Sequence, residues 1–509
     1  MSLRLFNTLG KKKETLKPLR DKLFRYYSCG PTVYDYPHIG NWRSFILADV
    51  LKKYLRFKGF KVKHVMNITD VDDKLIKKSR GKRDELAKIT KFYEKKFLEG
   101  MAELNIKKPD ILPKATTHIR EMRNLIQKLI DKGFAYLAED NSIYYDVSKF
   151  RGYGKLSGIR VKKLKAGARV RADEYEKEEA MDFALWKAWK PEDGEIFWSP
   201  VFRVNGKRVR IKGRPGWHIE CSAMSMKYLG ESFDIHSGGA DLIFPHHENE
   251  IAQSEAATGK RFVRYWVHNE LLLVEGKKMS KRYGNIFTLE DLKARGYPPL
   301  TLRYLYLTTH YRDVLNFTWE ALEGAKNALE KIQNFYENLL VAKQISSARK
   351  LKSDEEKILN KIREIAKGIE RAMDDNLNTP VALAQLHKLI DLGNSYLKKQ
   401  EVNRKVVNEF LGKLLEVDSF FSLLRRRVKV FFVEFEELDI REARRGEVDR
   451  ILREISKRRD PRKVKKLLGI RQFYRKRKEW KKADAIRKKL RELGVIINDL
   501  PQGFSFKFT

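Results

Sequence analysis

The chain of 509 residues contains two cysteines, Cys29 and Cys221. Two thiols cannot form a disulfide framework, and such a pair is usually buried, catalytic or bound to a metal. Further along, His246 and Glu250 are four residues apart, so on a short helix they share one face and can chelate one ion. Two thiolates, one imidazole and one carboxylate are suitable zinc ligands. Spacing leaves the ligand set open, because His247 and Glu250 also form a helix-face pair.

A second group of residues suits phosphate. The segment Cys29-Gly-Pro-Thr-Val-Tyr-Asp-Tyr-Pro-His-Ile-Gly-Asn41 places His38, Gly40 and Asn41 at the start of an expected helix. Helix N-terminal amides favour anions, glycine permits close backbone approach, and imidazole and amide side chains can donate to phosphate oxygens. The pattern therefore predicts an ATP-binding turn, with an ordinary loop as the alternative.

A lysine-rich loop follows a later predicted strand, which ends at Val274. It reads Glu275-Gly-Lys-Lys-Met-Ser-Lys-Arg282, and two lysines flank its Met-Ser pair. Such a loop at a strand end can complete a nucleotide site, where Lys278 and Lys281 would stabilise phosphate oxygens.

The elements around these motifs indicate a parallel sheet. Residues 23–30 have strand character, 41–56 have helical spacing, and 61–68 form a second strand, which is a βαβ unit. Strand patterning returns at 233–236 and 263–274. The prediction is an α/β fold: a Rossmann-type doubly wound parallel sheet, interrupted by an inserted connective domain.

We expect an α-helical bundle after Thr318, a plausible helix cap, and a small RNA-binding domain at the C-terminal end. The expected boundaries are: catalytic domain, first half, 1–120; connective insertion, 121–209; catalytic domain, second half, 210–317; helical bundle, 318–430; and basic anticodon-binding domain, 440–509. Within the insertion, Asn205-Gly206 between alternating residues predicts a basic hairpin over 201–211. Its face is either merely solvated or in contact with RNA.

Charge points to a polyanionic partner. The chain has 107 Lys and Arg against 68 Asp and Glu, a formal net charge of +39. Between residues 441 and 492 there are 23 basic and 8 acidic residues. There, Ile470, Phe473, Trp480, Ala483, Ile486 and Leu490 predict one helical stripe. Because the sequence has no uncharged run long enough to span a bilayer and no secretory start, we expect a cytoplasmic protein without membrane contact.

The two motifs resemble the signatures of class I aminoacyl-tRNA synthetases, and the surrounding sequence is similar to the cysteinyl-tRNA synthetases over nearly the whole chain. The first signature comprises Pro31, Thr32, His38, Ile39, Gly40 and Asn41, and the second comprises Lys278, Met279, Ser280, Lys281 and Arg282. Other matching stretches include Asn67-Ile-Thr-Asp-Val-Asp-Asp-Lys74 and Gly216-Trp-His-Ile-Glu-Cys-Ser-Ala-Met224.

The resemblance implies one zinc ion per chain, held by Cys29, Cys221, His246 and Glu250. It implies a cysteine pocket lined by Thr69, Trp217, His236 and Asp241. The substrates would be L-cysteine, tRNA(Cys) and ATP with Mg²⁺, and His38, Asn41, Lys278 and Lys281 would be catalytic. A monomer is expected.

Three features depart from the family pattern. Asn41 stands where many class I enzymes have histidine, and Arg282 stands where serine is usual, which leaves the role of position 282 open. The segment 196–212 is longer than the resemblance leads one to expect. Three other functions stay open. The first is an ATP-dependent cysteine ligase acting on an amino sugar, which would not need the basic C-terminal domain, and the second is a non-catalytic RNA-binding relative, which should lack signature residues. The third is a zinc-binding adenylyltransferase that makes a dinucleotide cofactor, against which the helical bundle and the matching stretches argue.

Overall fold

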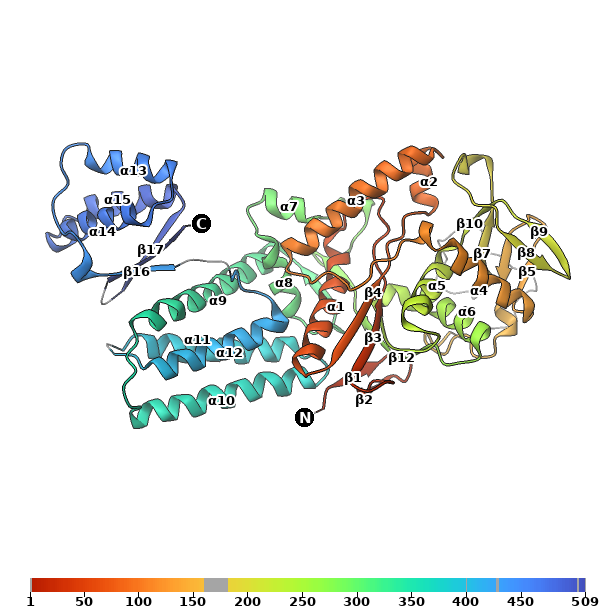
Figure 1. Ribbon diagram of the computed structural model, residues 1–509, viewed down its shortest axis with the longest axis horizontal. Coiled ribbons are helices and arrows are strands. Elements are labelled where there is room, and N and C mark those ends of the chain that lie inside the picture. Colours follow the sequence, from red (N-terminus) through yellow and green to blue (C-terminus); the bar gives the residue numbers. More distant parts are fainter. Residues whose placement is uncertain (1, 160–181, 400, 427–429, 501–502, 509) are drawn as a thin grey trace. The chain divides into compact units, whose positions relative to one another are not determined.

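The computed structural model describes residues 2–159, 182–399, 401–426, 430–500 and 503–508 (Figure 1). Part of the expected insertion, residues 160–181, and the side chain of Lys281 lie outside this description. In the described ranges, the helices are too short or too polar to cross a membrane. The chain divides into two compact units, Met1–Asn327 with Ile369–Leu383 and Ser419–Ser422, and Ala328–Gly368 with Ala384–Asp418 and Leu423–Thr509.

The first unit is built on a parallel sheet with the spatial order β12-β11-β3-β4. Its strands are β3 (Leu23–Ser28), β4 (Lys61–Met66), β11 (Phe233–Gly239) and β12 (Val263–Asn269). The chain runs outward from β3 to β4 and resumes at β11 on the other side of β3. The carboxyl ends of β3 and β11 therefore flank the topological switch point, where ligands bind in doubly wound sheets. The predicted parallel α/β sheet is confirmed.

Residues on both faces of β3 and β11 are buried, so these are interior strands. In β3 the five residues after Leu23 are all buried, and β11 is buried throughout. Helix α1 (Ile39–Phe57) packs against β4, β11 and β12, and α5 (Trp217–Leu229) packs against β3 and β4. The remaining helices and strands of this part are α2 (Asp73–Ser79), α3 (Arg83–Glu103), α6 (Glu248–Thr258), β1 (Arg4–Asn7) and β2 (Lys12–Thr15).

A separate antiparallel sheet lies between the two halves of the parallel sheet in the sequence, with the order β10-β7-β6-β5. Its strands are β5 (Ala135–Leu137), β6 (Ile143–Tyr145), β7 (Phe183–Ala188) and β10 (Gly213–Pro215), and helix α4 (Ile119–Asp131) precedes them. The predicted hairpin is confirmed: β8 (Val201–Val204) pairs with β9 (Lys207–Arg210). Asn205 and Gly206 have φ of 48° and 78°, which the tight turn requires.

The second signature lies on a small sheet with the order β14-β13-β15. Its strands are β13 (Leu272–Val274), β14 (Lys277–Lys278) and β15 (Leu315–Phe317), and helices α7 (Leu289–Ala294) and α8 (Pro299–Leu307) lie between β14 and β15 in the sequence. The signature is thus at a strand end, as its spacing indicated.

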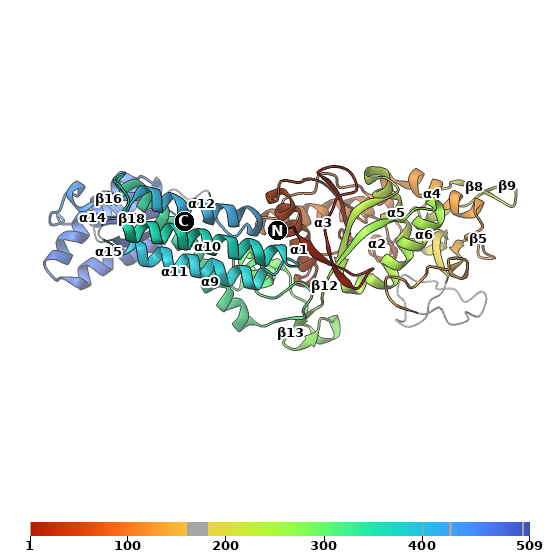
Figure 2. The ribbon, with the colours of Figure 1, turned by 90° about the horizontal axis from the view of Figure 1, so that it is seen from below.

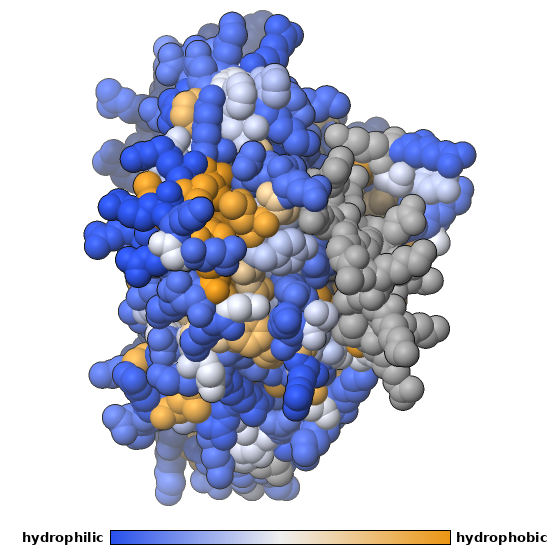
Figure 3. Space-filling view, turned by 90° about the vertical axis from the view of Figure 1, so that its right-hand side faces the viewer, coloured by the Kyte–Doolittle hydropathy of each residue, from blue (hydrophilic) through white to orange (hydrophobic). Residues whose placement is uncertain are grey.

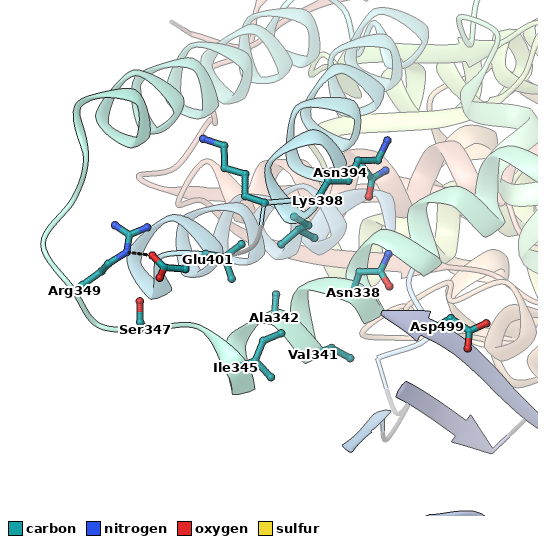
Figure 4. Close-up of a pocket in the computed structure, with 13 residues that line it drawn as sticks. Asn338, Val341, Ala342, Ile345, Ser347, Arg349, Asn394, Lys398, Glu401 and Asp499 are labelled. Carbon is teal, nitrogen blue, oxygen red and sulfur yellow. Dashed lines mark ion pairs between the residues drawn. The ribbon is translucent and has the colours of Figure 1, made fainter. Parts of the chain in front are cut away.

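Long helices follow, seen side by side in Figure 2. They are α9 (Trp319–Ile345), α10 (Ser353–Asp374), α11 (Thr379–Leu397) and α12 (Arg404–Phe421). The predicted cap is confirmed, because the Thr318 hydroxyl oxygen accepts from the Ala321 amide at 3.0 Å. In the second unit, side chains of α9 and α11 line a cavity of about 770 Å³, and its lining includes Arg349 and Glu401, which form an ion pair (Figure 4).

The C-terminal part has an antiparallel sheet, β16-β18-β17, and three helices. The elements are β16 (Val430–Glu434), α13 (Glu447–Lys457), α14 (Pro461–Lys476), α15 (Trp480–Glu492), β17 (Val495–Leu500) and β18 (Gly503–Phe508). The prediction of one stripe on one helix is wrong. The chain turns at Lys478, where φ is 61°, and Trp480 is 54% exposed instead of joining Ile470 and Leu490 in the core.

Candidate active site and metal centre

Four potential ligands from three elements meet at the switch point. Cys29 follows β3, Cys221 lies in α5, His246 lies just before the start of α6, and Glu250 lies in the first turn of α6. Their ligand atoms are all within 4.8 Å of one another. His246 Nε2 lies 3.0 Å from Glu250 Oε1, which lies 3.9 Å from Cys29 Sγ. The structure therefore brings together the four residues that the resemblance implies.

A second set of four overlaps the first. Cys29, His236, His247 and Glu250 also place their ligand atoms within 4.8 Å of one another. His247 Nε2 lies 3.3 Å from Cys29 Sγ, and His236 Nε2 lies 3.0 Å from Glu250 Oε2. This set contains one sulfur and omits Cys221, whereas the first contains two. Because zinc favours thiolate, the donor chemistry favours the first set.

His246 of the first ligand set and His247 of the second set each contact a further histidine that orients the ring. His246 Nδ1 lies 2.8 Å from His218 Nδ1, and His247 Nδ1 lies 2.8 Å from His268 Nε2. Partners of this kind fix the ring orientation and tautomer of metal-binding histidines. Sequence reasoning assigned no role to His218 or His268, because neither has a characteristic spacing to the cysteines.

Burial and mutual contact shift the pKa values of the cluster. A hydrogen bond with the Cys29 thiol and the nearby His246 imidazole lower the pKa of Cys221 to about 6. Burial lowers the pKa of His246, but the Cys221 thiolate and Glu250 outweigh it and raise that pKa to about 10. Burial, with Cys221 next to it, raises the pKa of Cys29. These side chains by themselves thus favour a Cys221 thiolate paired with a His246 imidazolium, and binding a cation would release protons.

The residues of the expected cysteine pocket surround these ligands. The Trp217 ring lies 4.2 Å from the His246 ring, between centroids. The Thr69 hydroxyl donates to Glu220 at 2.9 Å, and Glu220 immediately precedes Cys221. Asp241 is exposed, yet its charge acts on the pKa of both Cys29 and His38. An exposed carboxylate there can bind a substrate ammonium group.

His38 caps helix α1. Its Nδ1 accepts from the Asn41 amide at 3.3 Å, and the Asn41 side-chain oxygen accepts from the His38 amide at 3.0 Å. Burial lowers the pKa of His38, although Asp241 opposes the shift. The imidazole is therefore neutral at pH 7, and because Nδ1 accepts, its hydrogen is on Nε2. His38 can donate that hydrogen to an anion at the helix N-terminus.

The two signatures are in contact. The Ile39 amide donates to the Phe287 carbonyl at 2.7 Å, and His38 pairs with Thr288 through a β-bridge. A Cβ added to Gly40 would lie 2.3 Å from Met279 Cε. Gly40 therefore permits the close approach of the Met279 side chain in the second signature, a role that its spacing alone did not reveal. On the other side, the Thr69 amide donates to the Pro31 carbonyl at 3.1 Å, next to Thr32.

Asn285 holds the second signature in its turn. Its side-chain oxygen accepts from the Ser280 amide at 2.9 Å, and its amide group donates to the Lys278 carbonyl at 3.2 Å. Lys278 and Arg282 are exposed, and the Arg282 amide donates to the Ser280 hydroxyl oxygen at 3.1 Å. Lys281 is placed only through its backbone, in a short helical turn, Lys281–Tyr283.

A split parallel sheet with these two signatures at its carboxyl edge defines a class I aminoacyl-tRNA synthetase. Solved structures share the fold: Mycobacterium tuberculosis methionyl-tRNA synthetase with methionyl-adenylate has a TM-score of 0.55 at 13% identity, covering 79% of this chain and 90% of that one. Agrobacterium radiobacter LeuRS in its ternary complex has a TM-score of 0.57 at 12% identity, covering 79% and 84%.

Family models give the narrower assignment. Residues 15–327 match the class I (C) tRNA synthetase catalytic domain, 368–425 the DALR domain, and 461–503 the cysteinyl-tRNA ligase anticodon binding domain. Koribacter versatilis cysteine–tRNA ligase is 44% identical over 516 residues, covering 100% of both chains. Its Thermococcus onnurineus counterpart is 42% identical over 508 residues, covering 100% of this chain and 99% of the relative. The chain belongs to the cysteinyl-tRNA synthetase family.

Proposed function

We propose that this chain activates L-cysteine with ATP and transfers the cysteinyl group to tRNA(Cys), with zinc selecting the substrate thiol. The observation that carries the proposal is the position of two sites at the same edge of the parallel sheet. The sulfur-containing ligand cluster and the capped N-terminus of α1 both lie beyond the carboxyl end of β3, and the charge of Asp241 acts on Cys29 in the cluster and on His38 at the helix end. A thiol bound at the cluster would therefore lie beside ATP bound at the helix.

Zinc fits the ligands present. Two sulfurs, one imidazole and one carboxylate within 4.8 Å of one another match its preferred donors. His218 would orient His246, and the lowered pKa of Cys221 keeps that ligand deprotonated. When bound, zinc supplies a Lewis-acid centre that accepts cysteine as its thiolate and disfavours the serine hydroxyl. Shape alone separates such near-isosteres by only about 10- to 200-fold.

The other pocket residues would orient the amino acid. Asp241 would pair with its ammonium group, and Trp217, which stacks near His246, would cover the side chain. Thr69 is held by Glu220, so its hydroxyl oxygen can accept only from a defined direction. This arrangement would direct the substrate carboxylate toward α1.

In the activation step, a carboxylate oxygen attacks the α-phosphorus of ATP while the bond to the diphosphate leaving group breaks. Magnesium would accompany ATP and screen its charge. The Nε2 hydrogen of His38 and the ammonium groups of Lys278 and Lys281 would stabilise the phosphate oxygens, and Asn41 and Gly40 would keep the helix end in place. No protein nucleophile is required. In the transfer step, a terminal ribose hydroxyl of tRNA attacks the carbonyl carbon, and AMP leaves.

The test compares two acceptors of the cysteinyl group, tRNA(Cys) and an amino sugar, and two amino acids, cysteine and serine. We expect charging of tRNA(Cys) with labelled cysteine, no charging with labelled serine, and no ligation of cysteine to an amino sugar. Cysteine ligation to the sugar with no charging of tRNA would instead establish the alternative ligase. No ATP–diphosphate exchange at all would point to a non-catalytic RNA-binding relative. We further propose a cytoplasmic monomer, which fractionation and gel filtration test.

A further inference from the structure

The β8–β9 hairpin carries a concentrated positive charge that the metal and ATP sites do not use. No Asp or Glu occurs between Glu195 and Glu220. Within that stretch the exposed residues are Asn205 and Gly206 of the turn and five basic residues on and just after the hairpin: Arg203, Lys207, Arg208, Arg210 and Lys212. Among the described residues, none of these five forms an ion pair with a carboxylate.

The hairpin register places like charges opposite each other. Arg203 pairs with Arg208 across the two strands, and Arg210 follows two residues later on the same face. The opposite face carries Phe202, which is fully buried in the core of the insertion. Like charges directly opposite on a sheet destabilise it, so the folded chain retains an unfavourable pair on its exposed face. A bound polyanion would turn that repulsion into attraction.

The hairpin is rigidly held, which favours recognition through side chains. Gln127 of α4 accepts from the Arg203 amide at 2.8 Å and donates to the Arg203 carbonyl at 2.9 Å. Arg123 donates to the Val201 carbonyl at 2.7 and 2.9 Å. Helix α4 thus occupies the outer edge of β8, so another strand cannot pair there. The arginine-bearing face of the hairpin remains exposed.

The chemistry of this face suits a nucleic acid backbone. Arginine binds phosphate oxygens in a bidentate manner, and Arg208 and Arg210 lie two residues apart on one face of β9, so both can face the same polyanion. Next to the hairpin, the Lys212 ammonium lies 3.4 Å from the Trp189 ring centroid. In Figure 3, the side of the molecule labelled β8 and β9 in Figure 1 faces the viewer, and its surface is mostly hydrophilic.

We propose that the β8–β9 hairpin binds the phosphate backbone of the tRNA substrate through Arg203, Arg208 and Arg210. This inference rests on the proposed function, because charging requires the tRNA 3′ end to reach the edge of the same parallel sheet from which the insertion departs. The hairpin would hold the duplex next to that end, through its backbone and without reading bases.

The test measures charging kinetics of Arg203→Gln with Arg208→Gln, using an in vitro transcript of tRNA(Cys). We expect KM for tRNA to rise several-fold and the slope of log affinity against log salt to become shallower by about 2, one for each lost phosphate contact. Cysteine-dependent ATP–diphosphate exchange, which needs no tRNA, should be unchanged. The matched control, Arg20→Gln with Lys61→Gln, removes two charges near the amino ends of β3 and β4 and should alter neither quantity.

A second variant separates binding from structure. Arg208→Glu replaces the like-charge pair with an ion pair to Arg203, so we expect a thermal midpoint equal to or above that of the unmodified chain, together with a raised KM for tRNA. An unchanged KM and salt slope in both variants, with the unmodified chain charging tRNA normally, would overturn this inference alone. Absence of charging by the unmodified chain would overturn the proposed function, and this inference with it.

Discussion

His38 and Asn41 cap the N-terminus of α1 reciprocally, each backbone amide donating to the side chain of the other residue, at 3.3 and 3.0 Å. The sequence predicted Asn41 as a donor to ATP. The structure shows that its side-chain oxygen already accepts from the His38 backbone amide, and that its own backbone amide donates to His38 Nδ1 and so fixes the tautomer of His38. The helix cap alone therefore requires a side-chain hydrogen-bond acceptor at position 41, whether or not Asn41 also contacts the nucleotide.

Two substitutions at position 41 separate these roles. Asn41→Ala removes the acceptor and should destabilise the first unit by about 1 kcal/mol. Asn41→Asp keeps the acceptor but puts a negative charge beside the phosphates, so we expect an unchanged urea midpoint and a higher KM for ATP in exchange assays. A urea midpoint in Asn41→Asp as low as in Asn41→Ala would contradict the capping role.

Contact between the signatures predicts coupling between Gly40 and Met279. In Gly40→Ala the new methyl group would meet Met279 Cε, the flexible end of a side chain, so folding should survive. Displacement of the lysine loop should lower the exchange rate by roughly ten- to a hundred-fold. Adding Met279→Ala should restore part of the rate. Independent effects of the two changes in a double-mutant cycle would show that the contact has no role.

Metal content distinguishes the two overlapping ligand sets. If zinc is bound by the set with two sulfurs, His246→Ala should be purified with much less than one zinc per chain, while His247→Ala should retain it. Both side chains are buried, so circular dichroism must first show that each variant is folded. Loss of zinc from His247→Ala alone would assign the metal to the set that includes His236.

The second unit provides a pH prediction. Hydrogen bonds from Arg349, together with the Lys352 amide and the Tyr396 hydroxyl, lower the pKa of Glu355 to about 2. A carboxyl group whose pKa is lower in the folded chain than in the unfolded chain stabilises the fold. This stabilisation is complete at pH values above the unfolded pKa of about 4.3, and it is lost as the pH falls toward 2. The free-energy difference between the unmodified chain and Glu355→Gln should therefore shrink over that range. A free-energy difference between the two proteins that stays constant from pH 7 to pH 3 would contradict this prediction.

The parallel sheet was predictable because its evidence is local: β3 is rich in aromatic residues, and β4 follows it at βαβ spacing. The hairpin was predictable because its Asn205-Gly206 turn has a required backbone geometry. The break at Lys478 was not predictable, since a lysine with positive φ has no sequence signal and apolar residues on both sides keep helical spacing. The exposure of Trp480 was not predictable for the same reason, because its spacing from the other apolar residues is helical.

At the site, residue types and the family resemblance together indicated which four side chains meet, although Cys29 and Cys221 are far apart in the sequence. Spacing could not distinguish His246 from His247, because both rings do lie next to Cys29 or Glu250 in the fold. The contact of Met279 with Gly40 depends on how two distant loops pack, and no local pattern reports it.

The central claim is that a cysteine-ligated metal holds the substrate thiol beside ATP, and cysteine-dependent ATP–diphosphate exchange of Cys221→Ala tests it most directly. With folding verified by circular dichroism, we predict that exchange falls by more than about 100-fold, because even residues that only orient metal ligands typically cost 10- to 100-fold. Exchange at the rate of the unmodified chain, in a folded variant, would contradict the claim.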